Sequence, residues 1–182
     1  PKLIINATGD EFFLPSSSQF YFSDLLGEKH LRYVPNARHN LSRTDAMQTL
    51  LAYYHTILTD TPRPQFVWSF ESDGSILVKS GELPLAATLW SATNTTNRDF
   101  RVDTIGRSWT AEQLIPTEPG VYQTRPAKPK SGWKAFLVEM TYSTSLDIPM
   151  KLTTAVRVLP DTLPHPYVAP KWPAEGFIRN KP

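Results

Sequence analysis

The sequence predicts an α/β plus all-β protein, in which strand–helix units over residues 1–60 precede an antiparallel β-sandwich over residues 65–160. Before residue 60, short apolar runs alternate with segments of helical spacing, which is typical of a parallel sheet covered by helices. After residue 65, apolar residues recur at every second position, which favours strands. Six prolines between residues 160 and 182 predict an extended, Pro-rich tail over residues 161–182.

The first part contains two predicted strand–helix pairs. Residues 2–6 form a short apolar run that is typical of a buried parallel strand. Ser16 begins a capping-box pattern, which predicts a short helix that ends near Gly27. Residues 30–34 predict the second strand, and apolar residues at helical spacing over residues 42–58 predict an amphipathic helix. Because two strands are too few for a stable sheet, we expect further strands to precede them.

The second part reads as a series of short strands. Alternation at Phe66, Trp68 and Phe70 predicts the first strand, and Asp73-Gly74 supplies a turn after it. Five further strands are predicted at 76–78, 85–92, 99–103, 133–142 and 151–158. Several short strands joined by turns are typical of a sandwich. We expect its core to contain Phe66, Trp68, Leu89, Phe100, Phe136, Val138, Val156 and Val158.

Composition excludes several classes of protein. The chain of 182 residues has no cysteine, which excludes disulfides and thiol catalysis. Its formal net charge of +2 argues against nonspecific binding to nucleic acid. No apolar run approaches the roughly 20 residues of a membrane span. The four histidines show no metal-binding spacing. We therefore expect no metal, no cofactor, no nucleic-acid partner and no membrane span.

The sharpest candidate site lies in the loops that follow the two predicted parallel strands. Asp10 follows the first strand, and His39 follows the second. Because the carboxyl ends of parallel strands share one sheet edge, we expect the two side chains to meet there. An acid followed by a histidine matches the second half of a Ser-Asp-His hydrolase, in which the acid orients the imidazole. The spacing alone also fits a turn-forming Asp10 and a surface His39.

Glu11 is a rival acid in the same loop. We favour Asp10, because its shorter side chain directly follows Gly9 and has less rotational entropy to lose. A contact between Asp10 and a ring nitrogen of His39 at about 2.6–3.2 Å is the expected geometry.

Long motifs spread over most of the chain carry a family resemblance. They are GDEFFLPSSSQFYF (9–22), GEKHLRYVPNARHNL (27–41), LWSATNTTNRDFRVD (89–103), GWKAFLVEMTY (132–142) and LTTAVRVLPDTLP (152–164). These segments resemble the C-terminal part of PhoPQ-activated pathogenicity-related (PqaA-type) proteins, which are similar to α/β-hydrolases. The resemblance implies that Asp10 is the triad acid and His39 the triad base. It also implies export to the periplasm or the extracellular space. Arg38 departs from the pattern, since an acidic or small residue is expected beside the histidine.

A nucleophile is missing from the motifs. The eight glycines build no Gly-x-Ser-x-Gly elbow, and the nucleophile of this hydrolase order precedes the acid. We expect the C-terminal portion of an exported α/β-hydrolase-like protein, a serine hydrolase acting on ester or amide bonds when complete and inactive alone. Its expected partner is the missing N-terminal hydrolase half, and its small-molecule or peptide substrate stays open. The alternative is a noncatalytic secreted signalling or binding protein on a hydrolase scaffold.

Overall fold

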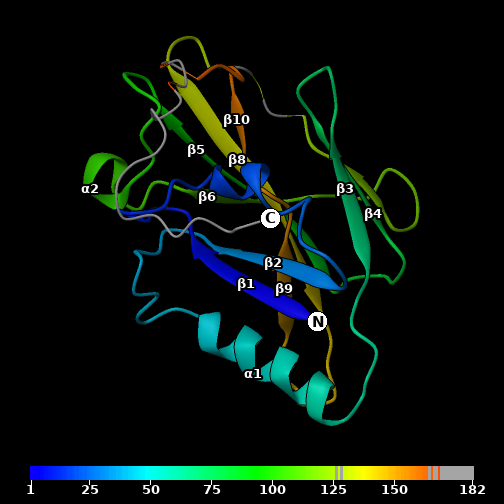
Figure 1. The fold of residues 1–182 in the computed structure, drawn as a ribbon. Coiled ribbons are helices and arrows are strands. Elements are labelled where there is room, and N and C mark those ends of the chain that lie inside the picture. Colours follow the sequence, from blue (N-terminus) through cyan, green and yellow to red (C-terminus); the bar gives the residue numbers. More distant parts are fainter. Residues whose placement is uncertain (126, 128, 164, 166–167, 169–182) are drawn as a thin grey trace, which may run out of the picture.

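The computed structural model describes residues 1–125, 127, 129–163, 165 and 168. The elements of the first sixty residues are β1 (Lys2–Ala7), the 3₁₀-helix η1 (Ser17–Phe20), β2 (Lys29–Val34) and α1 (Ala46–Leu58). The elements that follow are β3 (Phe66–Phe70), β4 (Ile76–Ser80), β5 (Ala86–Asn94), α2 (Val102–Ile105), β6 (Thr110–Gln113), β7 (Val121–Gln123), β8 (Trp133–Tyr142), β9 (Met150–Thr153) and β10 (Arg157–Leu159). The fold is therefore a mixture of α and β structure in which strands predominate (Figure 1).

A small parallel sheet holds the first part together. β1 pairs with β2 from Lys2 opposite Lys29 to Ala7 opposite Val34. α1 packs on one face of this sheet, where Ala46 joins a buried cluster with Ala7 and Val34 (Figure 1). A parallel pair needs a crossover between its strands, and the chain between residues 8 and 28 supplies it.

Two antiparallel sheets form the second part. One has the strand order β10-β8-β5-β6, with β9 also paired to β8, and the other has the order β3-β4-β7. The two sheets share a core cluster, in which Ile76 and Val78 of β4 meet Phe136 and Val138 of β8. The apolar alternation of these strands thus buries one face of each sheet against the other.

β8 is buried on both of its faces. Phe136 and Val138 belong to the cluster shared with β4, whereas Leu137 belongs to a second cluster that contains Leu31 and Tyr33 of β2. The sheet that contains β8 is consequently a middle layer between the three-stranded sheet and the parallel sheet. This double burial explains why residues 133–142 read as a nearly continuous apolar run.

Two strand predictions need correction, and two strands were missed. The strand predicted over 99–103 is wrong, because α2 begins at Val102. The Asp99 carboxylate accepts hydrogen bonds from the Arg101 N–H at 3.1 Å and the Thr104 hydroxyl at 2.7 Å, which favours a turn into that helix. The strand predicted over 151–158 is interrupted after Thr153 and continues as β10. β6 and β7 were not predicted, and all four residues of β6 are exposed.

Other predictions agree with the structure only in part. The short helix near Ser16 is a single 3₁₀ turn, and the Ser16 side chain makes no capping hydrogen bond. Phe66 and Trp68 are half-buried, whereas the other six expected core residues are buried. The predicted extended tail over 161–182 lies largely outside the described residues. In the part of the chain that the structure describes, no helix is long and apolar enough to cross a membrane.

Candidate active site

The carboxyl ends of β1 and β2 lie side by side and carry the two loops of the candidate site. The Thr8 N–H donates to the Val34 carbonyl at 3.1 Å, and the Gly9 N–H donates to the Ala37 carbonyl at 3.1 Å. The Asn36 N–H donates to the Thr8 hydroxyl at 3.0 Å. These bonds extend the pairing of the strands into their loops, so the loop residues that follow have fixed relative positions.

Gly9 allows the first loop to pass against α2. A Cβ built on Gly9 would lie 2.3 Å from Cγ2 of Val102, which is closer than real Cβ contacts. The Gly9 carbonyl accepts a hydrogen bond from the Val102 N–H at 3.1 Å. Close approach of the backbone therefore requires glycine immediately before Asp10.

Asp10 and His39 form a hydrogen-bonded pair. Oδ2 of Asp10 lies 2.9 Å from Nδ1 of His39, within the predicted range. Oδ1 of Asp10 accepts the N–H groups of Phe12 at 2.7 Å and Phe13 at 3.0 Å. The carboxylate is thus held through both of its oxygens, one by its own loop and one by the imidazole.

Local hydrogen bonds keep Asp10 ionised despite its burial. Asp10 is only 5% exposed, and this burial by itself would raise its pKa. Hydrogen bonds from the Phe13 N–H, from His39 and from the Phe12 N–H outweigh the burial and hold the pKa of Asp10 below its usual range. Asp10 is therefore a carboxylate at neutral pH and can accept a hydrogen bond from a protonated ring nitrogen of the imidazole.

His39 is accessible on the side away from Asp10. Its side chain is 46% exposed, and the rings of Phe12 and Phe13 lie 5.1 Å and 5.6 Å from the imidazole centroid. Among the described residues, Nε2 of His39 has no hydrogen-bond partner. The rival acid Glu11 accepts the backbone N–H of His39 at 3.2 Å and does not contact the imidazole. Glu11 therefore supports the loop, whereas Asp10 orients the ring.

The cation beside His39 is neutralised locally. Arg38 forms an exposed ion pair with Asp103, and the hydrogen bond that the guanidinium donates to this carboxylate raises the pKa of Arg38. The counter-ion of Arg38 therefore lies on α2 and not in the two loops of the candidate site.

Comparisons with known proteins place the chain in a family. A model of the PhoPQ-activated pathogenicity-related protein family matches residues 1–101, which include both loops of the candidate site. The chain belongs to this family. The chain is also 35% identical over 191 residues to autocrine proliferation repressor protein A of Dictyostelium discoideum, in an alignment that covers 90% of this chain. The chain spans 39% of the length of that relative. No solved structure matches the chain.

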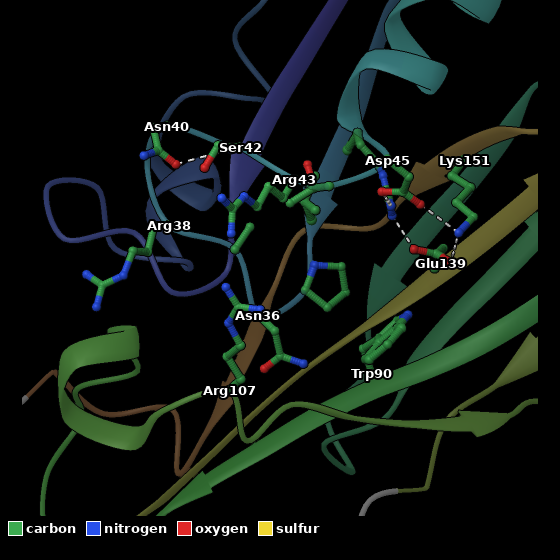
Figure 2. Close-up of a pocket in the computed structure, with 15 residues that line it drawn as sticks. Asn36, Arg38, Asn40, Ser42, Arg43, Asp45, Trp90, Arg107, Glu139 and Lys151 are labelled. Atoms are coloured by element: carbon green, nitrogen blue, oxygen red, sulfur yellow. Dashed lines mark hydrogen bonds and ion pairs between the residues drawn. The ribbon is translucent and has the colours of Figure 1, made fainter.

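The structure contains a second polar cluster, which was not predicted from the sequence. Arg32 of β2 is 1% exposed and forms ion pairs with Glu139 of β8 and with Asp45, whose carboxylate lies 2.9 Å from it. Lys151 of β9 completes the cluster, with Nζ at 2.7 Å from Asp45 and 3.8 Å from Glu139 (Figure 2). Burial would raise the pKa of Asp45, but Arg32 and Lys151 outweigh it and lower this pKa.

The sequence held only a faint signal for this cluster. Arg32 lies between the apolar residues Leu31 and Tyr33, and Glu139 lies between Val138 and Met140. Charges in such positions are almost never buried without a partner. A buried pair was therefore foreseeable, but the identity of the partner was not, because the two residues lie 107 positions apart. In the described residues, no three metal-ligating side chains come together to hold an ion.

Proposed function

We propose that this chain supplies the acid and the base of a serine-hydrolase site, and that an upstream segment of a longer protein supplies the nucleophile. The observation that carries the proposal is the 2.9 Å bond between Asp10 and Nδ1 of His39 at the carboxyl ends of two parallel strands. The accessible Nε2 of His39 supports it, because this nitrogen is the one that must face a serine.

The residues of this chain would act as a proton relay for acyl transfer. Nε2 of His39 takes the proton of the attacking serine hydroxyl, and the imidazolium then gives it to the leaving alcohol or amine. Asp10 keeps Nδ1 protonated and stabilises the imidazolium without taking the proton itself. Water repeats the sequence on the acyl-enzyme and releases the acid, so the substrates are esters or amides.

The free edge of β1 supports an upstream partner segment. β1 pairs only with β2 in the described residues, and Leu3, Ile4 and Ile5 remain half-buried. We expect a parallel strand of the upstream hydrolase half to pair with this edge, which would make β1 and β2 the last strands of an α/β-hydrolase sheet. The partial coverage of the Dictyostelium relative is consistent with such a segment.

The fold of the second part and the location of the protein belong to the same proposal. We expect the two antiparallel sheets to form a β-sandwich domain that follows the hydrolase sheet. Their shared core cluster supports this arrangement. Export to the periplasm or the extracellular space is expected from the family. The term autocrine in the name of the Dictyostelium relative fits that location.

A second candidate function is a noncatalytic, secreted signal on a hydrolase scaffold. The name of the same relative describes a repressor of proliferation and favours this alternative. A hydrolase fold does not by itself entail hydrolysis. The two candidates differ in whether the upstream segment holds a nucleophile that reaches Nε2 of His39.

Ester hydrolysis by the longer protein tests the proposal. We expect hydrolysis of a short-chain p-nitrophenyl ester, and we expect His39→Ala and Asp10→Asn each to lower kcat at least about a hundredfold. Glu11→Gln is the matched control, since it alters an acid of the same loop that does not touch the imidazole. The 182-residue chain alone should stay below ~1 turnover per second. Full activity in His39→Ala would refute the proton relay, and an inactive parent that still signals would favour the alternative.

A further inference from the structure

A concave pocket lies beside the candidate dyad, on the loop that follows β2. It encloses about 380 Å³, and Arg38 and Asn40, the two neighbours of His39, both line it. Its floor is formed by Trp90 of β5 together with the ion cluster of Asp45, Glu139 and Lys151 (Figure 2). The pocket thus lies at the carboxyl end of a parallel strand, where ligands of α/β sheets bind.

The charges of this pocket are not balanced. The two carboxylates that line it, Asp45 and Glu139, are already paired with Arg32 and Lys151. Arg38 is paired with Asp103, outside the pocket. Two further arginines, Arg43 and Arg107, have no hydrogen-bond or ion-pair partner among the described residues. Two positive charges therefore face the pocket without a counter-charge.

The two unpaired arginines line the same pocket. In the view of Figure 2 the guanidinium ends of Arg43 and Arg107 lie toward the same part of it, with Asn36 beside Arg107, while Arg38 points away. Asn36 fixes the segment that carries Arg107, because its amide donates to the Trp109 carbonyl at 2.9 Å and accepts the Trp109 N–H at 3.0 Å. Both arginines are exposed, so water screens their mutual repulsion, and an anion between them would neutralise the two charges.

Neutral donors complete the lining. Ser42 contributes a hydroxyl group and Asn40 an amide, whereas the Thr44 hydroxyl already donates to the Leu41 carbonyl at 2.6 Å and the Asn36 amide donates one hydrogen to the Trp109 carbonyl. Behind them, Nε of the buried Arg32 and Nε1 of Trp90 have no hydrogen-bond partner in the described residues. The pocket therefore offers several N–H and O–H donors, and its two carboxylates are already paired with cations.

We propose that this pocket binds a phosphate-class oxyanion, held between the guanidinium groups of Arg43 and Arg107. Each guanidinium presents a planar fork of N–H donors that matches two oxygens of a phosphate. A phosphate dianion carries the two negative charges that would balance the two arginines, and its remaining oxygens can accept the hydroxyl and amide donors. The inference does not depend on the hydrolase proposal.

The test measures phosphate binding to the full 182-residue chain by isothermal titration calorimetry at constant ionic strength. Inorganic phosphate represents the free ion, phenyl phosphate represents a phosphate monoester, and acetate serves as a monoanion control. The variants are Arg43→Gln and Arg107→Gln, with Arg125→Gln as the matched control, because Arg125 is exposed and lies outside the pocket. Circular dichroism checks that each variant is folded.

We expect saturable binding of at least one phosphate source, weakened at least tenfold by Arg43→Gln and by Arg107→Gln and unchanged by Arg125→Gln. Arg43→Lys and Arg107→Lys should give intermediate losses, since lysine keeps the charge but lacks the fork. Tighter binding of phenyl phosphate would identify a monoester as the ligand, and tighter binding of inorganic phosphate would identify the free ion. The proposal is overturned by the absence of saturable binding, by equal affinity for acetate, by loss in only one glutamine variant, or by equal loss in Arg125→Gln.

Discussion

Asp10 combines a buried carboxylate with a partner that is open to solvent. Its loop donates two backbone N–H groups to one oxygen, and His39 holds the other. The acid is consequently fixed by the chain around it, whereas the imidazole depends on the acid for its orientation. Substitutions at Asp10 should therefore change both the position of His39 and the response of the fold to pH.

The first prediction concerns acid stability. Because the pKa of Asp10 is lowered in the folded protein, the unfolded state binds more protons on acidification. The contribution of Asp10 to the free energy of unfolding should be complete above about pH 5 and should disappear as the pH falls through the lowered pKa. Urea denaturation of the wild type and Asp10→Asn from pH 7 to pH 3 measures this contribution.

Glu28, whose pKa is also lowered, does not affect the difference in stability between the wild type and Asp10→Asn. Its hydrogen bond with Arg63 lowers the pKa of Glu28 to about 2, but this effect is present in both proteins and cancels. We expect the stability difference between the wild type and Asp10→Asn to narrow toward pH 3. A difference that stays constant over the whole range would contradict the prediction.

The second prediction concerns the glycine before the acid. Gly9→Ala places a methyl group against Val102, and overpacking of this kind typically costs about 1–3 kcal/mol. Val102→Ala in the Gly9→Ala background should restore part of the loss, because it removes the nearest atom. Urea denaturation of both single variants and of the double variant gives the coupling. Equal stability of Gly9→Ala and the wild type would show that the loop can move away from α2.

At the scale of the elements, one buried ion pair joins two layers of the fold. Arg32 lies on β2 of the parallel sheet, and Glu139 lies on β8 of the middle sheet. Removal of Glu139 leaves the buried Arg32 with Asp45 as its remaining counter-charge, whereas replacement of both Arg32 and Glu139 by apolar side chains is a change that proteins often tolerate. We therefore expect the ion pair to fix the relative position of the two sheets, and to contribute little to the free energy of unfolding compared with an apolar pair at the same positions.

The third prediction follows from that asymmetry. Glu139→Gln should lower the free energy of unfolding by less than the roughly 3–5 kcal/mol of a fully uncompensated buried charge, because Asp45 still pairs with Arg32, and Arg32→Met combined with Glu139→Leu should recover most of the loss. Arg38→Gln is the control, because its pair with Asp103 is exposed and should leave the unfolding midpoint unchanged. Thermal unfolding followed by circular dichroism measures all three. A double variant less stable than Glu139→Gln would contradict the prediction.

The elements also show how far sequence reasoning reaches. β1, β2 and α1 were predictable because apolar residues recur at strand or helix spacing within each segment, and the loops that carry Asp10 and His39 follow from these strands. The face that α1 buries was not predictable, because Ala52, Tyr53 and Thr56 are buried while the larger apolar residues of the helix are exposed. β6 was not predictable, because its four residues are exposed and show no alternation. The pocket was not predictable either, since Arg43 and Arg107 come together only through the tertiary fold.

At the scale of the whole molecule, the layers differ in how well they are covered. β8 is enclosed on both faces and paired with β5 on one side and with β9 and β10 on the other. β1 has a neighbour on one edge only among the described residues, and several large apolar side chains of α1 are exposed: Met47, Leu50, Leu51, Tyr54, Ile57 and Leu58. The upstream segment that we propose would pair with the free edge of β1.

The fourth prediction uses this contrast. In the 182-residue chain, peptides from β8 should exchange their amide hydrogens slowly and peptides from β1 should exchange faster, because open edges are less protected. In the longer protein, β1 should become as well protected as β2. Hydrogen exchange with mass spectrometry on both proteins measures the change. Equal exchange of β1 in the two proteins would contradict pairing at this edge.

The double burial of β8 also bears on how the polypeptide can be divided. Residues 59–65 look like a natural place to cut, yet the pieces on either side of them share the cluster of Leu31, Tyr33 and Leu137 and the ion pair of Arg32 and Glu139. After a single proteolytic cut between Thr61 and Pro64, both pieces should elute together in size-exclusion chromatography. The complex should also unfold in one cooperative thermal transition. Expressed separately, each piece would expose half of an interior and should aggregate.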